Sequence, residues 1–314
     1  MTTLLVASAG GHLAQLHALA KRMDGLDADR LWVCLDTPQA RTLLADERKV
    51  LLPPVMERDV AGVLRAFGYA RRIIRGKERI RSVISTGSAI ALAFLPYAVL
   101  WGIETHYIES AARVSRPSLT GRILQRVPGI RLYRQYPHVA TGRWRFGGSV
   151  FDGFRGIETE PRPVRRVVVT VGVGRPFRRL LEAAARVIPP NVEVLWQTGD
   201  TPIDGLAIEA RPFVPGAELE QAVREADAVV AHAGCGSALM ALSAGKHPVL
   251  IPRDPDHGEV IDRHQIEIAE WLAKRGLATR CDPETLRFDD IARAAGFAVE
   301  SLSEVPRFDL ARRR

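Results

Sequence analysis

Arg166-Val167-Val168-Val169-Thr170-Val171 is a run of strand-forming residues in the middle of the chain, and Gly172 follows it directly. The chain opens in the same way, because residues 3–7 form an apolar strand pattern that precedes Gly10 and Gly11. After each of these starts, short β-branched runs alternate with helical patterns, which is typical of parallel α/β sheets. The restart in mid-chain predicts two doubly wound, Rossmann-like domains.

Each half has its own series of expected elements. In the first half we expect strands over residues 3–7, 30–35, 50–52, 82–85 and 105–108, and helices over 13–22 and 60–75. In the second half we expect strands over 166–171, 192–197, 228–232 and 249–251. Residues 158–166 contain Pro161 and Pro163 among charges and are interpreted as a linker. We therefore place the domains at 1–157 and 158–314, facing a common cleft.

The composition is that of a globular protein, with 46% hydrophobic and 25% charged residues in 314. Three cysteines without metal-site or disulfide spacing fit a reducing cytosol. The longest apolar run, 89–103, contains Pro96 and is shorter than the roughly 20 residues of a spanning helix. We interpret it as a core helix that leads into a strand. With no signal-peptide pattern at the start, we expect a cytoplasmic protein.

The net charge of +8 is unevenly distributed, at +11 over residues 1–157 and −3 over 158–314. A basic first half predicts an anionic partner such as a phospholipid surface or a phosphorylated acceptor. The alternative is that the arginines of the first half only cover solvent-exposed helix faces and bind no anionic partner. Nucleic acid is disfavoured, since aromatics make up 6% of the chain and no basic-aromatic stacking platform is visible.

The first glycine turn is Ala7-Ser8-Ala9-Gly10-Gly11-His12. Paired glycines at a strand-to-helix turn allow close approach of a ligand to the backbone, and the helix start favours a phosphate. The pattern is not the dinucleotide fingerprint GxGxxG. His12 is a candidate general base, because a neutral imidazole accepts a proton near neutral pH. The alternative is that it only fills the turn.

The second half repeats this arrangement twice. Gly172 and Arg175 lie in the loop after its first strand, and His232-Ala233-Gly234-Cys235-Gly236-Ser237 follows a later apolar strand. Backbone N–H groups at Gly234 and Gly236, with the Ser237 hydroxyl, suit a diphosphate. Cys235 is interpreted as a packing residue.

A polar stretch, residues 254–265, follows the strand that ends near Arg253. It contains His257, Glu259, Asp262, His264 and Gln265, whose spacing matches no common metal template. We expect no metal here and interpret the stretch as hydrogen-bonding groups for sugar hydroxyls.

Together these motifs resemble a known family over nearly the whole chain. Residues 4–150 are similar to the acceptor-side subunit, and 165–300 to the donor-side subunit, of the two-part N-acetylglucosaminyltransferase that extends dolichol-linked chitobiose. Bacterial exopolysaccharide transferases, MurG and the family 28 C-terminal domain are also similar. The resemblance rests on motifs in matching order: residues 8–12, 107–114 and 118–121 on the acceptor side, and residues 169–172, 176–177, 232–237, 244–246, 251–253 and 264–265 on the donor side.

The resemblance implies an inverting GT-B glycosyltransferase that needs no metal or cofactor beyond its UDP-sugar. His12, or less favourably Glu109, would deprotonate the acceptor hydroxyl. The donor sugar would be of the N-acetylglucosamine, glucose or glucuronic acid class. The acceptor would be a polyprenyl-diphosphate-linked sugar at the inner face of the plasma membrane. The implied acceptor residues are Gly10, Gly11, Ser110, Arg113 and Thr120, and the implied donor residues are Gly172, Arg175, Phe213, Val214, His232, Gly234, Gly236, Ser237, Arg253, Glu259, His264 and Gln265.

One position departs from the family. Where a glutamate is expected to hold the ribose, this chain has Met240, which accepts no such hydrogen bond. Glu259 or backbone groups are the expected substitutes. Two other functions stay open: a non-catalytic UDP-sugar-binding partner subunit, and a sugar-nucleotide 2-epimerase, whose signature carboxylates are not apparent.

Overall fold

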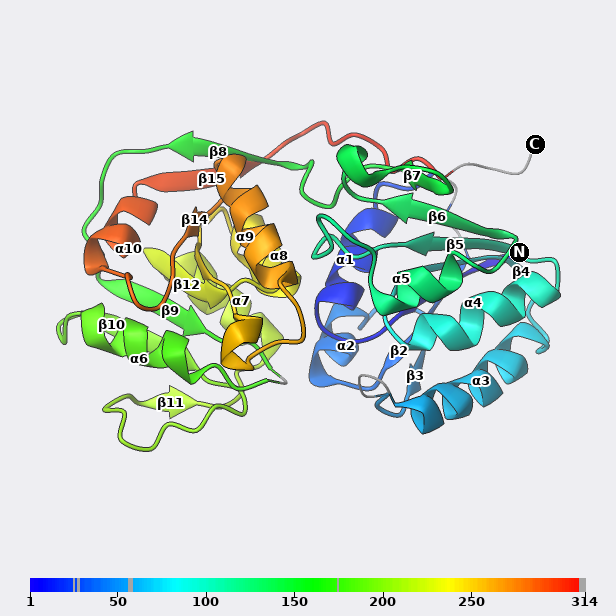
Figure 1. Ribbon diagram of the computed structural model, residues 1–314, viewed down its shortest axis with the longest axis horizontal. Coiled ribbons are helices and arrows are strands. Elements are labelled where there is room, and N and C mark those ends of the chain that lie inside the picture. Colours follow the sequence, from blue (N-terminus) through cyan, green and yellow to red (C-terminus); the bar gives the residue numbers. More distant parts are fainter. Residues whose placement is uncertain (25, 27–28, 56–58, 174, 311–314) are drawn as a thin grey trace. The chain divides into compact units, whose positions relative to one another are not determined.

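The computed structural model describes residues 1–24, 26, 29–55, 59–173 and 175–310, and the chain divides into two compact units (Figure 1). Unit 1 comprises Met1–Asp152 and the segment from Val305 onward, and unit 2 is Gly153–Glu304. This corrects the predicted ranges 1–157 and 158–314. The chain changes unit before residue 157, and its C-terminal segment returns to the first unit.

Unit 1 is built on a parallel sheet of seven strands with helices between them. The expected strands and the two expected helices are all present, and β6 and β7 are additional. The strands are β1 (Thr2–Ala7), β2 (Arg30–Leu35), β3 (Lys49–Leu52), β4 (Ile80–Gly87), β5 (Glu104–Ile108), β6 (Ile130–Arg134) and β7 (Trp144–Phe146). The helices are α1 (Gly11–Ala20), α2 (Pro38–Leu43), α3 (Val60–Ile74), α4 (Ile90–Leu100), α5 (Leu119–Leu124) and the 3-10 turn η1 (Pro137–Val139).

The strand order in unit 1 is β3-β2-β1-β4-β5-β6-β7, so the direction of winding reverses between β1 and β4. Ligands of doubly wound sheets bind at the carboxyl ends of strands beside such a reversal. β1 ends at Ala7 and β4 ends at Gly87, which places the first glycine turn at this point.

The core of unit 1 lies mainly between the sheet and helices α3 and α4, which pack side by side. The apolar run at residues 89–103 forms α4, and most of its side chains are buried, including Phe94 and Leu95. The prediction of a core helix leading into a strand is confirmed. No helix in the described part of the chain is long and apolar enough to cross a membrane.

Unit 2 contains a second parallel sheet, of six strands, and a separate two-stranded ribbon. The strands of the sheet are β9 (Arg166–Thr170), β10 (Glu193–Gln197), β11 (Ala210–Arg211), β12 (Ala228–His232), β13 (Val249–Ile251) and β14 (Thr279–Arg280). The helices are α6 (Arg178–Val187), α7 (Gly216–Glu225), α8 (Cys235–Ser243), the 3-10 turn η2 (Pro255–His257), α9 (His264–Lys274) and α10 (Phe288–Ala294).

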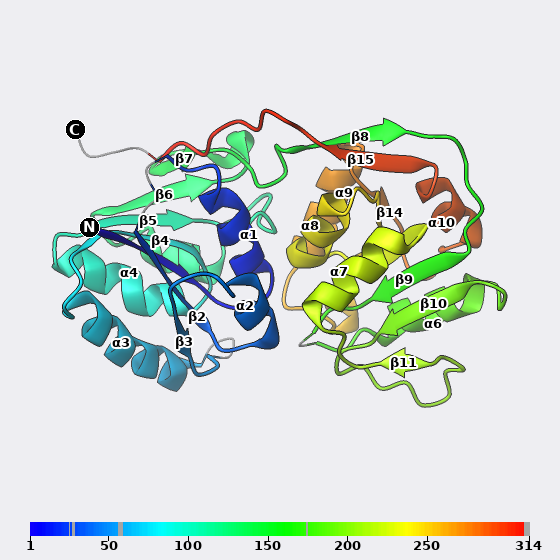
Figure 2. The same cartoon turned by 180° about the vertical axis from the view of Figure 1, so that it is seen from behind.

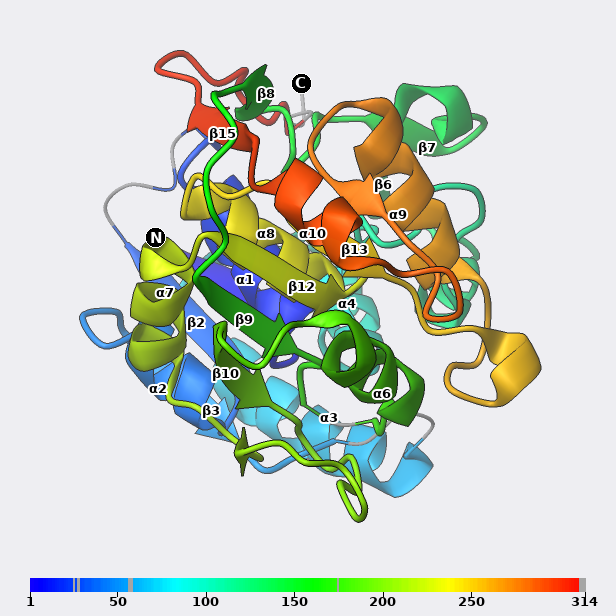
Figure 3. The same cartoon turned by 90° about the vertical axis from the view of Figure 1, so that its left-hand side faces the viewer.

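The strand order in unit 2 is β11-β10-β9-β12-β13-β14, and the winding reverses between β9 and β12. Helices α6 and α10 share one core cluster with the sheet, and α7 and α8 pack together against β9 and β12 (Figure 3). The loops that follow β9 and β12 therefore meet at the reversal. These are the two glycine-rich loops that the sequence predicted for the donor.

The ribbon explains why the domain boundary lies earlier than predicted. β8 (Phe154–Glu158) pairs antiparallel with β15 (Phe297–Ser301), and the Leu302 amide donates to the Gly153 carbonyl at 2.9 Å. Because β8 is bonded to unit 2, the proline-containing segment after it lies inside that unit instead of joining the two.

The C-terminal segment is fastened to unit 1 (Figure 2). Phe308 is 2% exposed and its ring contacts that of Tyr133. The Phe308 amide donates to the Arg22 carbonyl at 2.9 Å, and Arg22 in turn donates through Nε to the Pro306 carbonyl at 2.9 Å. The terminal residues Arg312–Arg314 lie outside the described residues, and the sequence does not indicate whether they contact lipid.

Candidate active site

The glycine turn of unit 1 is held by the neighbouring helix α2. Gly10 precedes α1 with a φ of 70°, which favours glycine. Its amide donates to Gln39 Oε1 at 2.7 Å, and Gln39 Nε2 donates back to the Gly10 carbonyl at 3.4 Å. The side chain of Gln39, which the sequence analysis did not predict as a site residue, therefore fixes the conformation of the predicted acceptor loop.

His12 lies half-buried at the start of α1 and is oriented by the end of β4. Its Nδ1 is 2.7 Å from the Thr86 carbonyl oxygen, and the Thr86 hydroxyl donates to the His12 carbonyl at 2.8 Å. Because a carbonyl only accepts, Nδ1 carries the proton and the lone pair of the neutral ring is on Nε2. Gly87 has a φ of 98°, and a Cβ there would lie 3.2 Å from the His12 ring.

Glu109, the predicted alternative base, is a buried hydrogen-bond acceptor, and its role as a base stays a prediction. The side chain is 1% exposed. Oε1 accepts from the Tyr107 hydroxyl at 3.1 Å and the Ser110 amide at 3.2 Å. Oε2 accepts from the Ser118 amide at 2.9 Å and its hydroxyl at 3.1 Å. With its four donors, the Glu109 carboxylate connects the loop after β5 to the start of α5. Burial of the Tyr107 hydroxyl, and then the negative charge of Glu109, raise the pKa of Tyr107.

A buried glutamine joins this loop to the glycine turn. Gln15 is 1% exposed; its Nε2 donates to the Gly11 carbonyl at 3.0 Å and to Ser110 Oγ at 3.1 Å. Its Oε1 accepts from the Ala111 amide at 2.7 Å and from Gln135 Nε2 at 3.1 Å. The turn and the loop after β5, which are far apart in the sequence, thus form one hydrogen-bonded unit.

The remaining predicted acceptor residues lie around this network. Ser110 is buried and bonded to Gln15, whereas Arg113 and Thr120 are half-buried. The Arg113 carbonyl accepts from Arg134 Nη2 at 3.0 Å, and Arg134 is itself 1% exposed. The structure brings Gly10, Gly11, His12 and Ser110 together, and places Arg113 and Thr120 on the adjoining loop and helix.

In unit 2 the two glycine loops enclose His232, the last residue of β12. A Cβ on Gly172 or on Gly234 would overlap the His232 ring, so both positions require glycine for close packing. The Gly172 amide donates to Thr170 Oγ1 at 3.1 Å, and Thr170 donates to Gln197 Oε1 at 2.6 Å. The predicted donor loops are therefore adjacent at the reversal between β9 and β12.

The first turn of α8 presents unpaired helix-start amides beside this histidine. Gly234 precedes the helix, and Gly236 and Ser237 lie in its first turn, where N–H groups have no partner within the helix. Ser237 Oγ is 3.4 Å from His232 Nδ1. Burial, and then the positive charge of Arg253, lower the pKa of His232 to about 3, so its ring is neutral at physiological pH.

Arg253 and Gln265, predicted as donor-binding residues, support the loop that follows β9. Arg253 is 4% exposed, and its Nη2 donates to the carbonyls of Val171 at 2.8 Å and Arg175 at 2.6 Å. Gln265 is 6% exposed, and its Oε1 accepts from the Arg253 amide at 3.0 Å. Arg253 and the Gln265 carbonyl are thus engaged inside unit 2, and Gln265 Nε2 is the atom that remains for a ligand. The roles of both residues in donor binding stay predictions.

Glu259, predicted as a ribose acceptor, is also engaged inside unit 2, and its contact with a ribose stays a prediction. Its carboxylate pairs with Arg179, with Nε–Oε1 at 2.8 Å, and accepts from the Asp254 amide at 2.9 Å. His264 begins α9 and its Nδ1 is 2.5 Å from Asp262 Oδ1. Met240, the position that departs from the family, lies half-buried on α8.

Phe213 and Val214, predicted together for the uracil ring, differ in exposure. Phe213 is 46% exposed, whereas Val214 is 1% exposed and belongs to the interior. Only the Phe213 side chain is available to stack on a base, and Val214 offers backbone atoms. Arg175 is exposed on the loop after β9.

A metal site is not evident in the described residues, where no group of three or more His, Cys, Asp and Glu side chains gathers. The expectation of metal-free chemistry remains a prediction.

Most of the residues that hold the site residues in place could not be predicted from the sequence, but two of them are partial exceptions. Gln15 is a polar residue on the otherwise apolar face of α1, and Gly87 is a further glycine after a predicted strand. Each of these two sequence features is compatible with a ligand site at the end of a strand. Gln39, Thr86 and Gln135 gave no signal, because each contacts the site from a distant element.

Comparison with known proteins finds a family match within the second unit. Residues 166–289 match the glycosyltransferase family 28 C-terminal domain. A stretch of 72 residues is 42% identical to the UDP-N-acetylglucosamine transferase subunit ALG13 of Yarrowia lipolytica, and covers 23% of this chain. That match spans only 35% of the relative's length.

The whole fold is similar to solved glycosyltransferases. MurG of Acinetobacter baumannii superposes with a TM-score of 0.56 at 17% identity, over 94% of this chain and 95% of MurG. SnogD from Streptomyces nogalater superposes with a TM-score of 0.57 at 18% identity, over 94% of this chain and 92% of SnogD. These likenesses confirm the predicted GT-B fold of two Rossmann-like domains.

Proposed function

Since this chain has a MurG-like GT-B fold whose second unit is a glycosyltransferase family 28 C-terminal domain, we propose that it transfers a sugar from a UDP-sugar to a lipid-linked acceptor. The observation that carries the proposal is the pair of glycine loops around His232, inside the matched domain. They bring two strand ends and the start of α8 to one point, which is the geometry that a diphosphate requires.

The donor half of the reaction follows from these groups. Amides of the first turn of α8 and the Ser237 hydroxyl would donate to the UDP phosphates, and would stabilise the negative charge that develops on the leaving diphosphate. A neutral His232 adds no charge of its own and fixes the spacing of Gly172 and Gly234. Phe213 is the exposed ring available to stack on uracil.

The acceptor half relies on His12. With Nδ1 donating to the Thr86 carbonyl, Nε2 is the basic nitrogen and would take the proton of the attacking hydroxyl. The acceptor oxygen would then displace UDP from the opposite face of the sugar and invert the anomeric configuration. The leaving diphosphate would be stabilised without a divalent ion, so EDTA should leave the rate unchanged.

A membrane-bound acceptor fits one surface of unit 1. On α3, Val60, Leu64 and Phe67 are 72%, 68% and 42% exposed, and at the end of α4 Trp101 is 53% exposed. Rings form a row from Phe67 through Tyr97 to Trp101, and Arg75 lies 5.2 Å from the Trp101 ring. Exposed apolar and aromatic groups flanked by arginines are what an anionic leaflet binds.

The experiment that tests this function is calorimetry with UDP, GDP, dTDP and a panel of UDP-sugars, without added metal. Selective uridine binding with a preference for one sugar supports the proposal and names the donor. If no uridine nucleotide binds, the donor assignment is wrong. Donor binding without transfer to any polyprenyl-diphosphate sugar would instead favour a non-catalytic partner subunit, and epimerised donor without an acceptor would favour an epimerase.

Membrane association has its own test. Cosedimentation with vesicles containing phosphatidylglycerol should exceed that with neutral vesicles and weaken with salt. The double variant Leu64→Ser, Phe67→Ser should lose binding. Binding that is independent of lipid charge and of these two residues would contradict a peripheral location on an anionic leaflet.

A further inference from the structure

Arg179 on α6 forms a bidentate ion pair with Glu259, in the loop that follows β13. Arg179 Nε lies 2.8 Å from Glu259 Oε1, and Arg179 Nη2 lies 3.3 Å from Glu259 Oε2. The two side chains are 23% and 11% exposed, so the pair is largely shielded from water. A bidentate pair of arginine and carboxylate fixes the orientation of both partners as well as their separation.

The position of Arg179 is not explained by the stability of its own helix. The first turn of α6 contains no acidic residue, and a cation there is disfavoured by the helix dipole. Glu259, which lies 80 residues further along the chain, supplies a negative charge at this point. The pair therefore connects the start of α6 to the loop after β13.

Glu259 also closes that loop on itself. Its Oε2 accepts from the Asp254 amide at 2.9 Å, and its own amide donates to the Asp254 carbonyl at 3.3 Å. Gly258, immediately before it, has a φ of 69° and donates to the Pro255 carbonyl at 2.9 Å. The loop from Asp254 to Glu259 is thus fixed at both ends, and Arg179 attaches it to α6.

Arg253, directly before this loop, extends the arrangement to the first glycine loop of unit 2. Its Nη2 donates to the carbonyls of Val171 and Arg175, which lie on either side of Gly172. Burial lowers the pKa of Arg253 to about 10, and the negative charge of Glu259 opposes this shift. The charge of Glu259 therefore stabilises the cation that holds the glycine loop.

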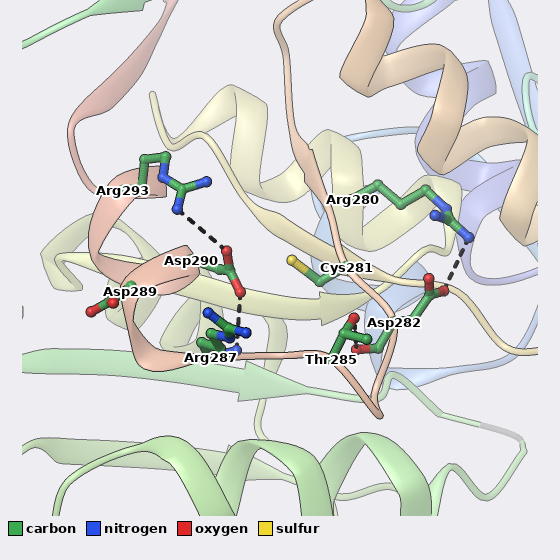
Figure 4. Close-up of a pocket in the computed structure, with 8 residues that line it drawn as sticks. All are labelled: Arg280, Cys281, Asp282, Thr285, Arg287, Asp289, Asp290 and Arg293. Atoms are coloured by element: carbon green, nitrogen blue, oxygen red, sulfur yellow. Dashed lines mark hydrogen bonds and ion pairs between the residues drawn. The ribbon is translucent and has the colours of Figure 1, made fainter.

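A second carboxylate on Arg179 provides the contrast. Glu284 accepts from Arg179 Nη1, but it is 59% exposed and belongs to the segment between β14 and α10. Asp282 and Thr285 of the same segment line a pocket of about 350 Å³, whose three arginines and three aspartates balance one another in charge (Figure 4). Because exposed ion pairs contribute little, Glu284 is the outer and weaker partner of Arg179.

We propose that Arg179 and Glu259 are positioning residues for the UDP-sugar. The pair holds the loop after β13 and, through Arg253, keeps the glycine loop at Gly172 in the conformation that receives the diphosphate. The inference rests on the proposed function, and it assigns to Glu259 an action through the protein instead of through the ribose. Three donors bond its two oxygens, namely Arg179 Nε, Arg179 Nη2 and the Asp254 amide.

The test is calorimetry of the full chain with UDP and with 2′,3′-dideoxy-UDP, which lacks both ribose hydroxyls. Glu259→Gln turns an N–H group toward other donors, because an amide has only one accepting oxygen, and should weaken both nucleotides by the same factor of about ten. A loss confined to UDP would show that the carboxylate contacts the ribose, and would overturn the proposal. An unchanged affinity for both nucleotides would overturn it as well.

Glu284→Gln is the matched control, since it makes the same chemical change in the exposed partner of Arg179. This variant should bind both nucleotides like the wild type. Equal losses in Glu284→Gln and Glu259→Gln would mean that any change of charge near Arg179 has this effect, and would contradict a specific role of the loop after β13.

A double-variant cycle shows whether the two residues act as one unit. Arg179→Met should weaken UDP as much as Glu259→Gln does, and the double variant should bind no more weakly than either single variant. Arg179→Lys should recover part of the affinity, because lysine restores the charge but not the bidentate geometry. Additive losses in the double variant would show that the two residues act independently, and would overturn the proposal.

A measurement without ligand separates this proposal from the proposed function. The Gly172 amide donates to Thr170 Oγ1 at 3.1 Å. Its hydrogen exchange, followed by NMR in the folded proteins, should be faster in Glu259→Gln than in the wild type, and unchanged in Glu284→Gln. If the wild type binds no uridine nucleotide, the proposed function is wrong, and faster exchange at Gly172 would still show that the ion pair controls the glycine loop. Unchanged exchange at Gly172 in Glu259→Gln would overturn the positioning role even in a protein that binds UDP.

Discussion

His12 and Thr86 are joined by two hydrogen bonds, one from the imidazole Nδ1 to the Thr86 carbonyl at 2.7 Å and one from the Thr86 hydroxyl to the His12 carbonyl at 2.8 Å. This reciprocal pair connects the start of α1 to the end of β4 across the reversal of the sheet. It selects the tautomer with a basic Nε2. In unit 2 the equivalent reversal encloses His232 between two glycines.

His12→Ala should lower kcat by about 10²–10⁴-fold, the usual contribution of a general base, and leave the UDP affinity unchanged. The measurement is steady-state transfer with saturating donor, together with calorimetry of UDP. His12→Ala with wild-type turnover would remove His12 as the base.

Gly87→Ala tests the orientation of His12 without removing it. A Cβ at Gly87 would lie 3.2 Å from the ring, in a backbone with φ of 98°, so the ring must shift and kcat should fall at least tenfold. The control is Gly102→Ala, where φ is 67° and a Cβ meets no atom within 4 Å. If the two variants lost the same activity, backbone strain alone would explain the effect.

Glu109→Gln should act on stability more than on proton transfer. An amide group would place N–H atoms against donors from Tyr107, Ser110 or Ser118, leaving buried groups unpaired. We expect unit 1 to lose about 1–3 kcal/mol in unfolding free energy, measured by urea denaturation. The pH–rate profile of the remaining activity should keep its shape. If Glu109→Gln lost the limb of the pH–rate profile that reflects titration of the general base, Glu109 would be the residue that takes the proton.

Gly234→Ala should weaken UDP binding at least tenfold, because the new methyl group overlaps the His232 ring and must displace the loop that receives the phosphates. Gly216→Ala, at the start of α7, is the control; a Cβ there meets nothing within 4 Å. Calorimetry with UDP measures both. Unchanged affinity in Gly234→Ala would place the diphosphate elsewhere.

The stability of unit 1 should fall as the pH falls below 6.5. Burial lowers the pKa of His106, which is 3% exposed, to about 4. Between pH 6.5 and about 4 the unfolded chain therefore binds a proton that the folded chain does not, which costs about 1.4 kcal/mol per pH unit for one such group.

His106→Gln should reduce this slope by about one proton, measured by urea unfolding between pH 7 and 5. Tyr133→Phe removes the hydroxyl that lies 3.0 Å from His106 Nδ1 but keeps the histidine, so it should change stability and retain the slope. An unaltered slope in His106→Gln would show that another group carries the pH dependence.

Phe308→Ala should destabilise unit 1 by about 3–5 kcal/mol, the usual cost of truncating a buried phenylalanine. Unit 2 should unfold as in the wild type. Hydrogen exchange of peptides from each unit, followed separately during urea unfolding, would distinguish the two transitions. Equal effects on both units would contradict the assignment of the C-terminal segment to unit 1.

The sequence by itself determined the architecture and the positions of the glycine motifs within it. Two strand–glycine–helix patterns predicted two doubly wound units, and the glycine turns lie at the reversals of both sheets, because local propensity and hydrophobic periodicity are properties of short segments. For this reason the sequence located His12, Gly172, Gly234 and Ser237 in or beside the turns that follow β1, β9 and β12, and their roles in catalysis and binding stay predictions.

Only the tertiary structure decided which polar groups remain for a ligand. Glu109, Glu259, Arg253 and the Gln265 carbonyl all belong to site motifs, yet each is engaged by groups inside its unit. Partners such as Gln15, Gln39 and Thr86 come from elements distant along the chain. Hydrogen-bond capacity is a property of three-dimensional neighbours, which no local pattern records. The domain boundary depended on the same kind of contact, the pairing of β8 with β15 across more than a hundred residues.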